Sequence, residues 1–319
     1  MEKLSFVIPV YRNQGSLAET HQRIKDTIET NLSEYALEIV FVDDGSDDGS
    51  LSELIDISRS DSRVRVLSLS RNFGQVSAVI AGLREATGDA VVIMSADLQE
   101  PLGKLPEMVQ EWAKGSEVVI CYRQIRQDTL LARVSSRAFY ALIHLASPTM
   151  PTTGFDFFLL GRPALDVVNQ LKERNRFFQG DVLWLGFRTT MLPYDRQQRR
   201  IGRSQWTLSR KVKYFLDGLL STSYWPIRSM SILGVLTSTV GFIYAGAIVY
   251  SWSLHSTPFT GWAPIMIVGL VLGGLNMLML GVLGEYVWRI YDEVRGRPSY
   301  IIQQIFRDGA PLAGHSRDR

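Results

Sequence analysis

The sequence predicts an α/β domain, built on a mostly parallel sheet with helices on both faces, followed by a two-helix membrane hairpin. Over residues 1–195, short apolar runs alternate with stretches of helical spacing, an order typical of parallel sheets. Near the C-terminal end, residues 229–252 and 263–284 contain no Asp, Glu, Lys or Arg, and neither does the loop 253–262. Each run exceeds the roughly 20 residues that cross about 30 Å of hydrocarbon as a helix.

The elements of the sheet are expected in a simple order. Strands are predicted at residues 4–10, 38–42, 64–69, 90–94 and 118–122. Apolar residues have helical spacing between them, for example over 17–28 and 106–114. In sheets of this kind ligands bind beyond the carboxyl ends of the strands, so the polar residues that follow each strand are the first candidates for a site.

Polar turns follow four of these strands, and we expect them to converge on one cleft. They occupy residues 9–13, 43–50, 70–74 and 95–101. Acid-rich loops in such places either hold a divalent cation through oxygen ligands or accept hydrogen bonds from a base or ribose.

Among the acids, Asp43 and Asp97 are expected to be functional, because each ends a buried strand where a carboxylate without a partner is costly. Asp48 and Ser50 are better explained as residues of a turn and a helix N-cap. The sequence contains neither Gly-x-Gly-x-x-Gly nor Gly-x-x-x-x-Gly-Lys-Ser/Thr. A bound diphosphate would therefore need a metal ion and arginines instead.

Composition narrows the class further. The single cysteine, Cys121, excludes an internal disulfide and a cysteine zinc site, and the four His lie far apart. The net charge of +2 says little, and no nucleic-acid partner is expected. Basic residues gather in one acid-free group: Arg196, Arg199, Arg200, Arg203, Arg210, Lys211 and Lys213.

The basic group runs into residues 206–228, where apolar residues recur every three or four positions. This pattern favours an amphipathic helix in the lipid interface; the alternative is a helix packed on the domain with a solvated basic face. Basic residues flank both outer ends of the hairpin but not its loop, so the positive-inside rule places both chain ends in the cytoplasm. The first residues show no signal-peptide pattern.

The expected organisation is a cytoplasmic domain, juxtamembrane helices, two membrane helices and a cytoplasmic tail. Their predicted ranges are 1–205, 206–228, 229–252, 263–288 and 289–319. Within the tail, residues 307–319 are rich in Gly, Pro and charge, and we expect them to be disordered.

Four ordered motifs, at residues 6–11, 41–50, 71–74 and 96–101, resemble the nucleotide-sugar half of family 2 glycosyltransferases of the Rossmann-like GT-A fold. With the hairpin, the chain resembles the polyprenyl-phosphate glycosyltransferases over essentially residues 4–300. Among these it is most similar to the bacterial bactoprenol glucosyl transferases of O-antigen modification, and more distantly to dolichol-phosphate mannose synthases. The resemblance implies transfer of a hexose, most simply glucose, from a UDP-sugar to undecaprenyl phosphate with inversion.

The resemblance also assigns donor-side residues. The nucleotide would be bound by Pro9, Tyr11, Asp43, Asp44, Arg71, Gly74, Ser95, Ala96 and Asp97. Asp97 and Gln99 would hold Mg²⁺ or Mn²⁺ against the diphosphate, with Asp97 thereby counted as catalytic. The usual pattern is Asp-x-Asp-x-Gln, and Ser95 replaces its first carboxylate here, which leaves Asp97 as the one acid of the motif.

On the acceptor side, Asp156 follows a Pro- and Thr-rich turn, in a sequence that suggests an apolar setting. Relatives imply a catalytic base, but a phosphate monoester is already largely anionic near neutral pH, since its second pKa is about 6. Asp156 is then a base, a group that orients the acceptor, or a structural carboxylate. The candidate phosphate- and acceptor-binding residues are Arg123, Arg126, Arg133, Arg199, Arg200 and Arg203.

Residues 199–206 resemble a loop that closes over the diphosphate in the family, with Gln205 in place of its usual Lys. The alternative is a basic patch that touches anionic lipid headgroups. Small residues in the second apolar run allow close helix packing and suggest a homo-oligomer, such as a tetramer. They are Gly269, Gly273, Gly274, Gly281 and Gly284.

Two rival functions stay open. One is a processive polysaccharide synthase of the same fold, but such enzymes have more membrane helices and a Gln-x-x-Arg-Trp motif, whereas residues 197–200 are followed by Ile201. The other is a membrane-anchored nucleotide-binding scaffold without turnover, which the replacement at Ser95 favours slightly.

Overall fold

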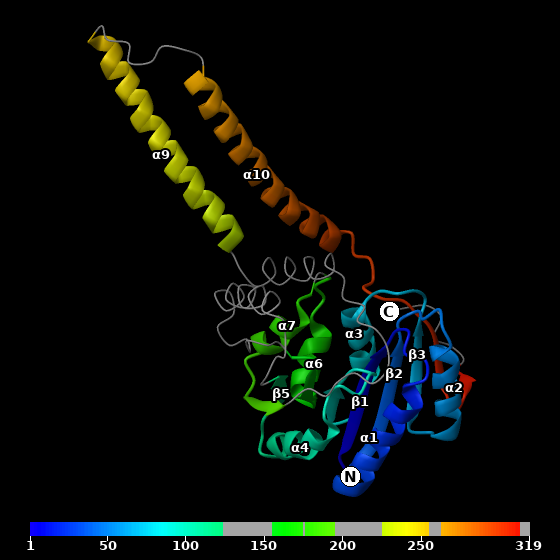
Figure 1. Cartoon of the computed structure of the whole chain (residues 1–319). Coiled ribbons are helices and arrows are strands. Elements are labelled where there is room, and N and C mark those ends of the chain that lie inside the picture. Colours follow the sequence, from blue (N-terminus) through cyan, green and yellow to red (C-terminus); the bar gives the residue numbers. More distant parts are fainter. Residues whose placement is uncertain (124–154, 175, 195–224, 255–262, 313–319) are drawn as a thin grey trace. The chain divides into compact units, whose positions relative to one another are not determined.

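A computed structural model describes residues 1–123, 155–174, 176–194, 225–254 and 263–312 of the chain (Figure 1). The chain divides into two compact units. One comprises Met1–Phe215 with Pro298–Arg319, and the other comprises Leu216–Arg297. Most of the predicted juxtamembrane segment, residues 206–224, lies outside the described residues.

The described part of the first unit contains a nine-stranded sheet with the order β7-β5-β6-β4-β1-β2-β3-β8-β9. Its strands are β1 Lys3–Val10, β2 Ala36–Asp43, β3 Val64–Leu69, β4 Ala90–Ile93, β5 Val118–Arg123, β6 Phe157–Gly161, β7 Thr189–Tyr194, β8 Ile302–Arg307 and β9 Ala310–Pro311. All five strands predicted from the sequence are confirmed within two residues.

The prediction of a mostly parallel sheet is confirmed for its centre and for the pair β5 and β7. Strands β4, β1, β2 and β3 are parallel neighbours, whereas β6 runs antiparallel between β4 and β5, and β8 runs antiparallel along β3. The sheet is therefore mixed. Strand order reverses between β1 and β4, which is the switch point where open α/β sheets bind ligands.

Helices cover both faces of the sheet. They are α1 Leu17–Asn31, α2 Ser50–Ser60, α3 Gln75–Glu85, the 3₁₀ turn η1 Leu102–Lys104, α4 Leu105–Ala113, α6 Arg162–Gln170 and α7 Phe178–Trp184. Helices α1, α2 and α4 contribute to the hydrophobic core on one face, and α3, α6 and α7 contribute to the core on the other.

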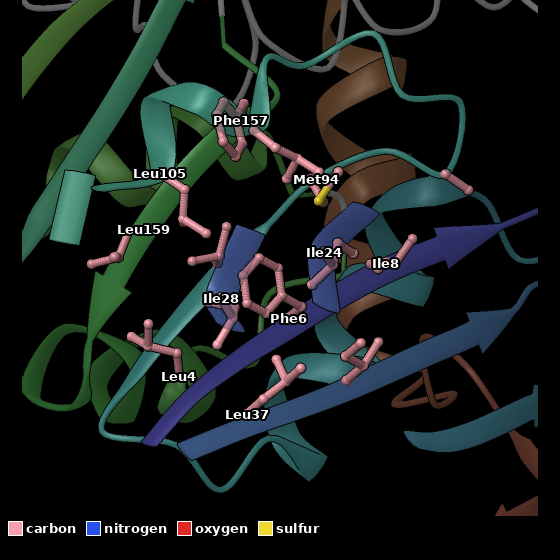
Figure 2. Packing of buried hydrophobic residues seen from close by; sticks show 14 of the residues in the cluster. Leu4, Phe6, Ile8, Ile24, Ile28, Leu37, Met94, Leu105, Phe157 and Leu159 are labelled. Carbon is pink, nitrogen blue, oxygen red and sulfur yellow. The ribbon is translucent and has the colours of Figure 1, made fainter. Parts of the chain in front are cut away.

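The central strands are buried on both sides, as their predominantly apolar sequences predict. In β1, Phe6 and Ile8 point to one core and Val7 points to the other. Figure 2 shows Phe6 beside Ile24 and Ile28 of α1, which recur on one face of that helix. Burial of a side chain such as Phe6 contributes about 1.5–3 kcal/mol, so these layers fix where the strand ends lie.

The expectation that residues 307–319 are disordered is wrong for their first part. Strand β8 pairs with β3, and β9 then pairs with β8. The backbone N–H of Gly309 donates to Ser58 Oγ over 3.2 Å. Strand β3 would otherwise present an unpaired edge, and this pairing explains why a polar, Gly-containing segment is ordered.

The second unit contains two long helices, α9 Trp225–Ser253 and α10 Ala263–Val294. Both are long and apolar enough to cross a membrane, over Ile227–Ser251 and Val271–Val294. Their described apolar side chains are largely exposed, in contrast to those of the sheet. Such a surface needs an apolar surrounding.

Candidate active site

The loops that follow β1 and β2 are fixed to each other. Arg12 Nε donates to Asp47 Oδ1 over 2.6 Å, and the Arg12 backbone N–H donates to Ser46 Oγ over 3.1 Å. The next N–H, of Asn13, donates to Ser50 Oγ over 2.9 Å. Arg12 has a φ of 55°, in the left-handed region that side chains disfavour. These contacts hold a turn that the isolated chain would rarely adopt.

Asp44 joins the ends of three strands. Its backbone N–H donates to the Val10 carbonyl over 2.8 Å. Its carboxylate oxygens accept the backbone N–H of Phe73 over 2.7 Å and that of Gly74 over 2.9 Å. Gly74 has a φ of 99°, which glycine tolerates best. The carboxylate therefore sets the shape of the loop after β3.

Gly45 lets the loops after β2 and β3 approach each other. A Cβ at Gly45 would lie 2.4 Å from the backbone carbonyl carbon of Arg71, so no side chain fits there. The Arg71 guanidinium lies 4.0 Å from the centre of the Phe73 ring and donates to the Asn72 carbonyl over 3.0 Å. Arg71 is exposed at the rim of these loops, where a guanidinium suits a phosphate.

The neighbouring acids Asp43 and Asp44 are buried, with 1% and 3% of their surface exposed. Burial raises the pKa of both carboxyls, and their hydrogen bonds to Ser46 and to the loop after β3 oppose the shift. Asp48 takes the turn role that the sequence predicts, because its Oδ1 accepts the Ser50 N–H over 3.0 Å. The Ser50 hydroxyl does not cap helix α2. It accepts the Asn13 N–H in the loop after β1 instead.

The loop after β4, residues 95–100, is anchored from below by α1. The Ala96 carbonyl accepts hydrogen bonds from Thr20 Oγ1 over 3.0 Å and from Ser16 Oγ over 3.4 Å. Ala96, Leu98, Gln99 and Glu100 are buried, whereas Ser95 and Asp97 are partly exposed. This loop therefore presents two polar side chains on a closely packed base.

Ser95 lies between two carboxyl groups. Its Oγ is 2.8 Å from Asp97 Oδ1 and 2.6 Å from Glu100 Oε2. Burial raises the pKa of Glu100 to about 7; the Ser95 hydrogen bond opposes this shift, and the charges of Asp97 and Asp156 add to it. The pKa of Glu100 therefore depends on charges in both the loop after β4 and the residue before β6.

The oxygens of Asp97 and Gln99 fit a hard divalent cation. Gln99 is 7% exposed, and its buried Oε1 has no hydrogen-bond partner among the described residues, an arrangement that costs free energy unless a ligand satisfies it. No group of three His, Cys, Asp or Glu residues gathers in the described part of the chain. A cation here would take its other ligands from a diphosphate and from water, as Mg²⁺ commonly does.

The acceptor-side candidates meet at the same edge of the sheet. Arg123 ends β5 and Tyr194 ends the neighbouring parallel strand β7, while Asp156 directly precedes the antiparallel strand β6. Arg123 Nη2 donates to Asp156 Oδ2 over 3.0 Å, and its Nε lies 3.5 Å from the Tyr194 hydroxyl. Burial opposes the charge of Arg123, but the Asp156 carboxylate raises the pKa of the guanidinium on balance.

The expectation of an apolar setting for Asp156 is wrong. Its side chain is 46% exposed, and Gln179 Nε2 of α7 donates to its Oδ1 over 3.3 Å and also to the Phe155 carbonyl. Phe155 and Phe157 on either side are buried. The flanking aromatic residues pack in the core, and the carboxylate between them turns to the surface and to Arg123.

The structure thus brings together the described donor-side candidates and places Asp156 beside Arg123. The other basic candidates, Arg126, Arg133, Arg199, Arg200 and Arg203, lie outside the described residues. Sequence reasoning missed Arg12, Glu100, Gln179 and Tyr194. Glu100 had a usable signal, since it belongs to a polar turn after a strand, whereas nothing local marks Gln179 as a partner of Asp156.

A mixed α/β sheet with acid-bearing loops joined at the ends of its central parallel strands has the architecture of the GT-A fold. The family model described as Glycosyl transferase family 2 matches residues 5–168, and the chain belongs to this family. It is a glycosyltransferase.

Near-full-length relatives carry related names. The chain is 36% identical to the uncharacterized glycosyltransferase YkcC of Bacillus subtilis, over 95% of this chain and 94% of that protein. It is 33% identical to the SfII prophage-derived bactoprenol glucosyl transferase of Shigella flexneri, over 96% of this chain and 99% of that protein. It is 32% identical to a prophage bactoprenol glucosyl transferase homolog of Escherichia coli, over 95% of this chain and 99% of that protein.

Proposed function

We propose that the protein transfers glucose from UDP-glucose to a polyprenyl phosphate, such as undecaprenyl phosphate, at the cytoplasmic face of the cell membrane. The observation that carries the proposal is that one chain contains both a transferase domain and two apolar helices. A family 2 domain with its acidic loops joined at one sheet edge is followed by two helices long and apolar enough to cross a membrane. Relatives that match over nearly their whole length are named for bactoprenol and glucosyl transfer.

On the donor side, the buried acids Asp43 and Asp44 shape a surface for the nucleoside. Pro9 and Tyr11, both half-buried, lie at the end of β1 beside these acids. Arg71 stands exposed at the rim and offers its guanidinium to the diphosphate. Asp97 and Gln99 would hold Mg²⁺ or Mn²⁺, which when bound offsets the charge that develops on the leaving diphosphate.

In the reaction, an anionic oxygen of the acceptor phosphate attacks the anomeric carbon of glucose. The bond from that carbon to the diphosphate oxygen breaks, UDP leaves with its electron pair, and the configuration inverts. Because the acceptor oxygen carries negative charge already, the chain needs to orient it more than to deprotonate it. Arg123, held by Asp156, is placed to attract that phosphate.

The membrane helices α9 and α10 supply access to the acceptor. A polyprenyl chain stays in lipid, so a hairpin in the same chain keeps the transferase where the phosphate emerges. We place both chain ends in the cytoplasm, from the positive-inside rule. A cysteine introduced in the hairpin loop, for instance Ser256→Cys, is expected to react with an impermeant maleimide from the outer face of intact cells, and reaction only after lysis contradicts the orientation.

Self-association in the membrane is a further part of the proposal. Among the described residues, nothing lies within 4 Å of where a Cβ would lie at Gly269, Gly273, Gly281 and Gly284 of α10. Small residues on open helix surfaces let neighbouring helices pack closely, which supports a homo-oligomer, with a tetramer as the form to test by crosslinking in membranes.

The decisive experiment incubates membranes containing the full chain with radiolabelled UDP-glucose, undecaprenyl phosphate and Mg²⁺ or Mn²⁺. We expect label to enter an organic-extractable lipid, and we expect EDTA to prevent this. UDP-galactose, UDP-N-acetylglucosamine and GDP-mannose serve as competing donors. Asp26→Asn is the matched control, because Asp26 is exposed on α1 and, among the described residues, accepts a local bond from Gln22 alone.

Three outcomes contradict the proposal in different ways. Label in a polymer that stays out of the organic phase would identify a processive synthase. Nucleotide binding without any transfer would identify a scaffold. Transfer from another donor sugar would keep the transferase and change its substrate.

A further inference from the structure

We propose that Glu100 is a positioning residue of the cation- and diphosphate-binding loop, and that it acts on Asp97 through the hydroxyl of Ser95. The inference rests on the proposed function in taking a divalent cation as the ligand of Asp97 and Gln99. It adds a residue that neither the composition nor the motifs of the sequence single out.

The first step is burial. Glu100 is 4% exposed, and a buried carboxyl group is costly unless it is hydrogen-bonded. Glu100 Oε2 lies 2.6 Å from Ser95 Oγ. Ser95 Oγ in turn lies 2.8 Å from Asp97 Oδ1. The buried Glu100 therefore contacts Ser95, and Ser95 contacts the partly exposed Asp97.

The second step is a count of hydrogens. A serine hydroxyl has a single hydrogen to donate, yet Ser95 Oγ is within hydrogen-bond distance of two carboxyl groups. Both carboxyl groups therefore bear on the place of this one hydroxyl. Glu100 is the buried member of the pair, so it fixes the Ser95 side chain where its Oγ contacts Asp97 Oδ1.

The consequence falls on Asp97. Its Oδ1 accepts from Ser95 and also lies 3.3 Å from the backbone N of Gln99. Two donors on one oxygen fix the orientation in which the carboxylate is presented to a cation. Groups that orient a ligand from behind typically change metal affinity 10- to 100-fold when they are removed.

A second buried Glu–Ser pair gives the matched contrast. Glu38 is 7% exposed and accepts from Ser5 Oγ over 2.5 Å, at the other end of the strands. It also accepts from the Thr87 N–H and hydroxyl and faces Arg65. Glu38 is a structural carboxylate with several donors, so its removal reports the cost of losing a buried acid with no effect on the site.

The experiment measures the dissociation constant of Mn²⁺ by electron paramagnetic resonance, on the full chain in detergent with saturating UDP. We expect Glu100→Ala and Ser95→Ala each to weaken Mn²⁺ binding about tenfold. The double variant is expected to be no weaker than either single one, because both changes break the same chain. Glu100→Gln is expected to stay within about threefold of wild type, since its amide has nearly the same shape and can still hydrogen-bond Ser95.

Glu38→Ala is expected to lower the melting temperature and leave Mn²⁺ affinity unchanged. Three results would each overturn the inference. They are an unchanged Mn²⁺ affinity in a folded Glu100→Ala protein, additive effects in the double variant, and a wild-type protein that binds no Mn²⁺. If Glu100→Ala does not fold, Ser95→Ala and Glu100→Gln decide it. The lipid-labelling assay is run in parallel: label that reaches lipid while these variants hold Mn²⁺ normally refutes the role of Glu100 and leaves the proposed function intact.

Discussion

The proposed donor and acceptor sides of the site hold their carboxylates in different ways. Asp44 is buried and accepts two backbone N–H groups, whereas Asp156 is 46% exposed and is held by the side chains of Arg123 and Gln179. Backbone donors are fixed once the strands are in place, but side-chain donors keep rotamer freedom. The donor side is thus shaped by the fold, and the acceptor side is shaped by side chains that can adjust.

This difference suits the two substrates that we propose. A nucleotide sugar is a soluble molecule of defined shape, and a preorganised surface reduces the cost of binding it. A lipid phosphate arrives from a moving bilayer, where an adjustable Arg is an advantage. Burial raises the pKa of Glu100, and the charges of Asp97 and Asp156, one from each side, add to that shift.

The largest effect is expected at the cation-binding acid. Asp97→Asn removes the anionic ligand, so the charge on the leaving diphosphate is no longer offset, and transfer should fall at least about a hundredfold, equivalent to several kcal/mol. The measurement is the initial rate of lipid labelling at saturating donor, with Asp26→Asn as the control. A variant that keeps more than a tenth of the wild-type rate would remove Asp97 from the metal site.

The next effect tests the fold-shaped donor side. Asp44→Ala leaves two backbone N–H groups without their acceptor, each worth about 1–3 kcal/mol when buried. We expect the melting temperature to fall by about 4 °C or more and the KM for the donor to rise more than the KM for the acceptor. Asp56→Ala is the control, because Asp56 is exposed and its one ion pair within the described part of the chain is with the exposed Arg59. Surface pairs contribute about 1 kcal/mol or less. Equal shifts in both KM values would contradict the assignment of Asp44 to the donor.

A third prediction concerns how stability depends on pH through the carboxyl group of Glu100. Burial raises the pKa of Glu100 from 4.5 to about 7, so the folded state binds this proton more tightly than the unfolded state. The resulting stability is fully present below about pH 4.5 and is lost as pH rises through about 7, with an upper limit of about 3 kcal/mol.

The test compares the wild type with Glu100→Gln, which cannot titrate at this position. The fall in melting temperature from pH 5 to pH 7.5 should be several degrees larger in the wild type. The shifted acids Asp43 and Asp44 are present in both proteins, so their contributions cancel. Parallel pH dependences would show that Glu100 does not carry the shifted pKa.

Much of the fold could be predicted because its central strands are buried on both faces. Runs such as residues 39–42 and 90–94 are apolar without interruption, and the polar turns after them mark the edge where ligands bind. The direction of β6 and the order of β8 could not be predicted. Both depend on which edge a later segment joins, and a local pattern contains no information on a partner far away in sequence.

The site divides in the same way. The places of Asp43 and Asp97 after strands could be read from the sequence, whereas Asp44 was assigned through the family resemblance. The pairing of Asp156 with Arg123 and Gln179 was not predictable, because β5, β6 and α7 meet only in the folded domain. The apolar neighbours of Asp156 suggested a buried carboxylate, but alternate residues of an extended segment point to opposite sides, and Asp156 takes the exposed side.

The smallest effect is expected from Gln179, and it tests how adjustable the acceptor side is. Gln179→Ala removes one hydrogen bond to Asp156 but leaves the Arg123 contact at 3.0 Å. A typical hydrogen bond contributes about 1 kcal/mol, so the KM for the lipid acceptor should rise up to about fivefold, with the donor KM unchanged. Arg123→Ala, which removes the phosphate-binding group itself, should raise the acceptor KM further. If Gln179→Ala instead costs as much as Asp44→Ala, the acceptor side is as rigid as the donor side, because one flexible partner would then be indispensable to the position of Asp156.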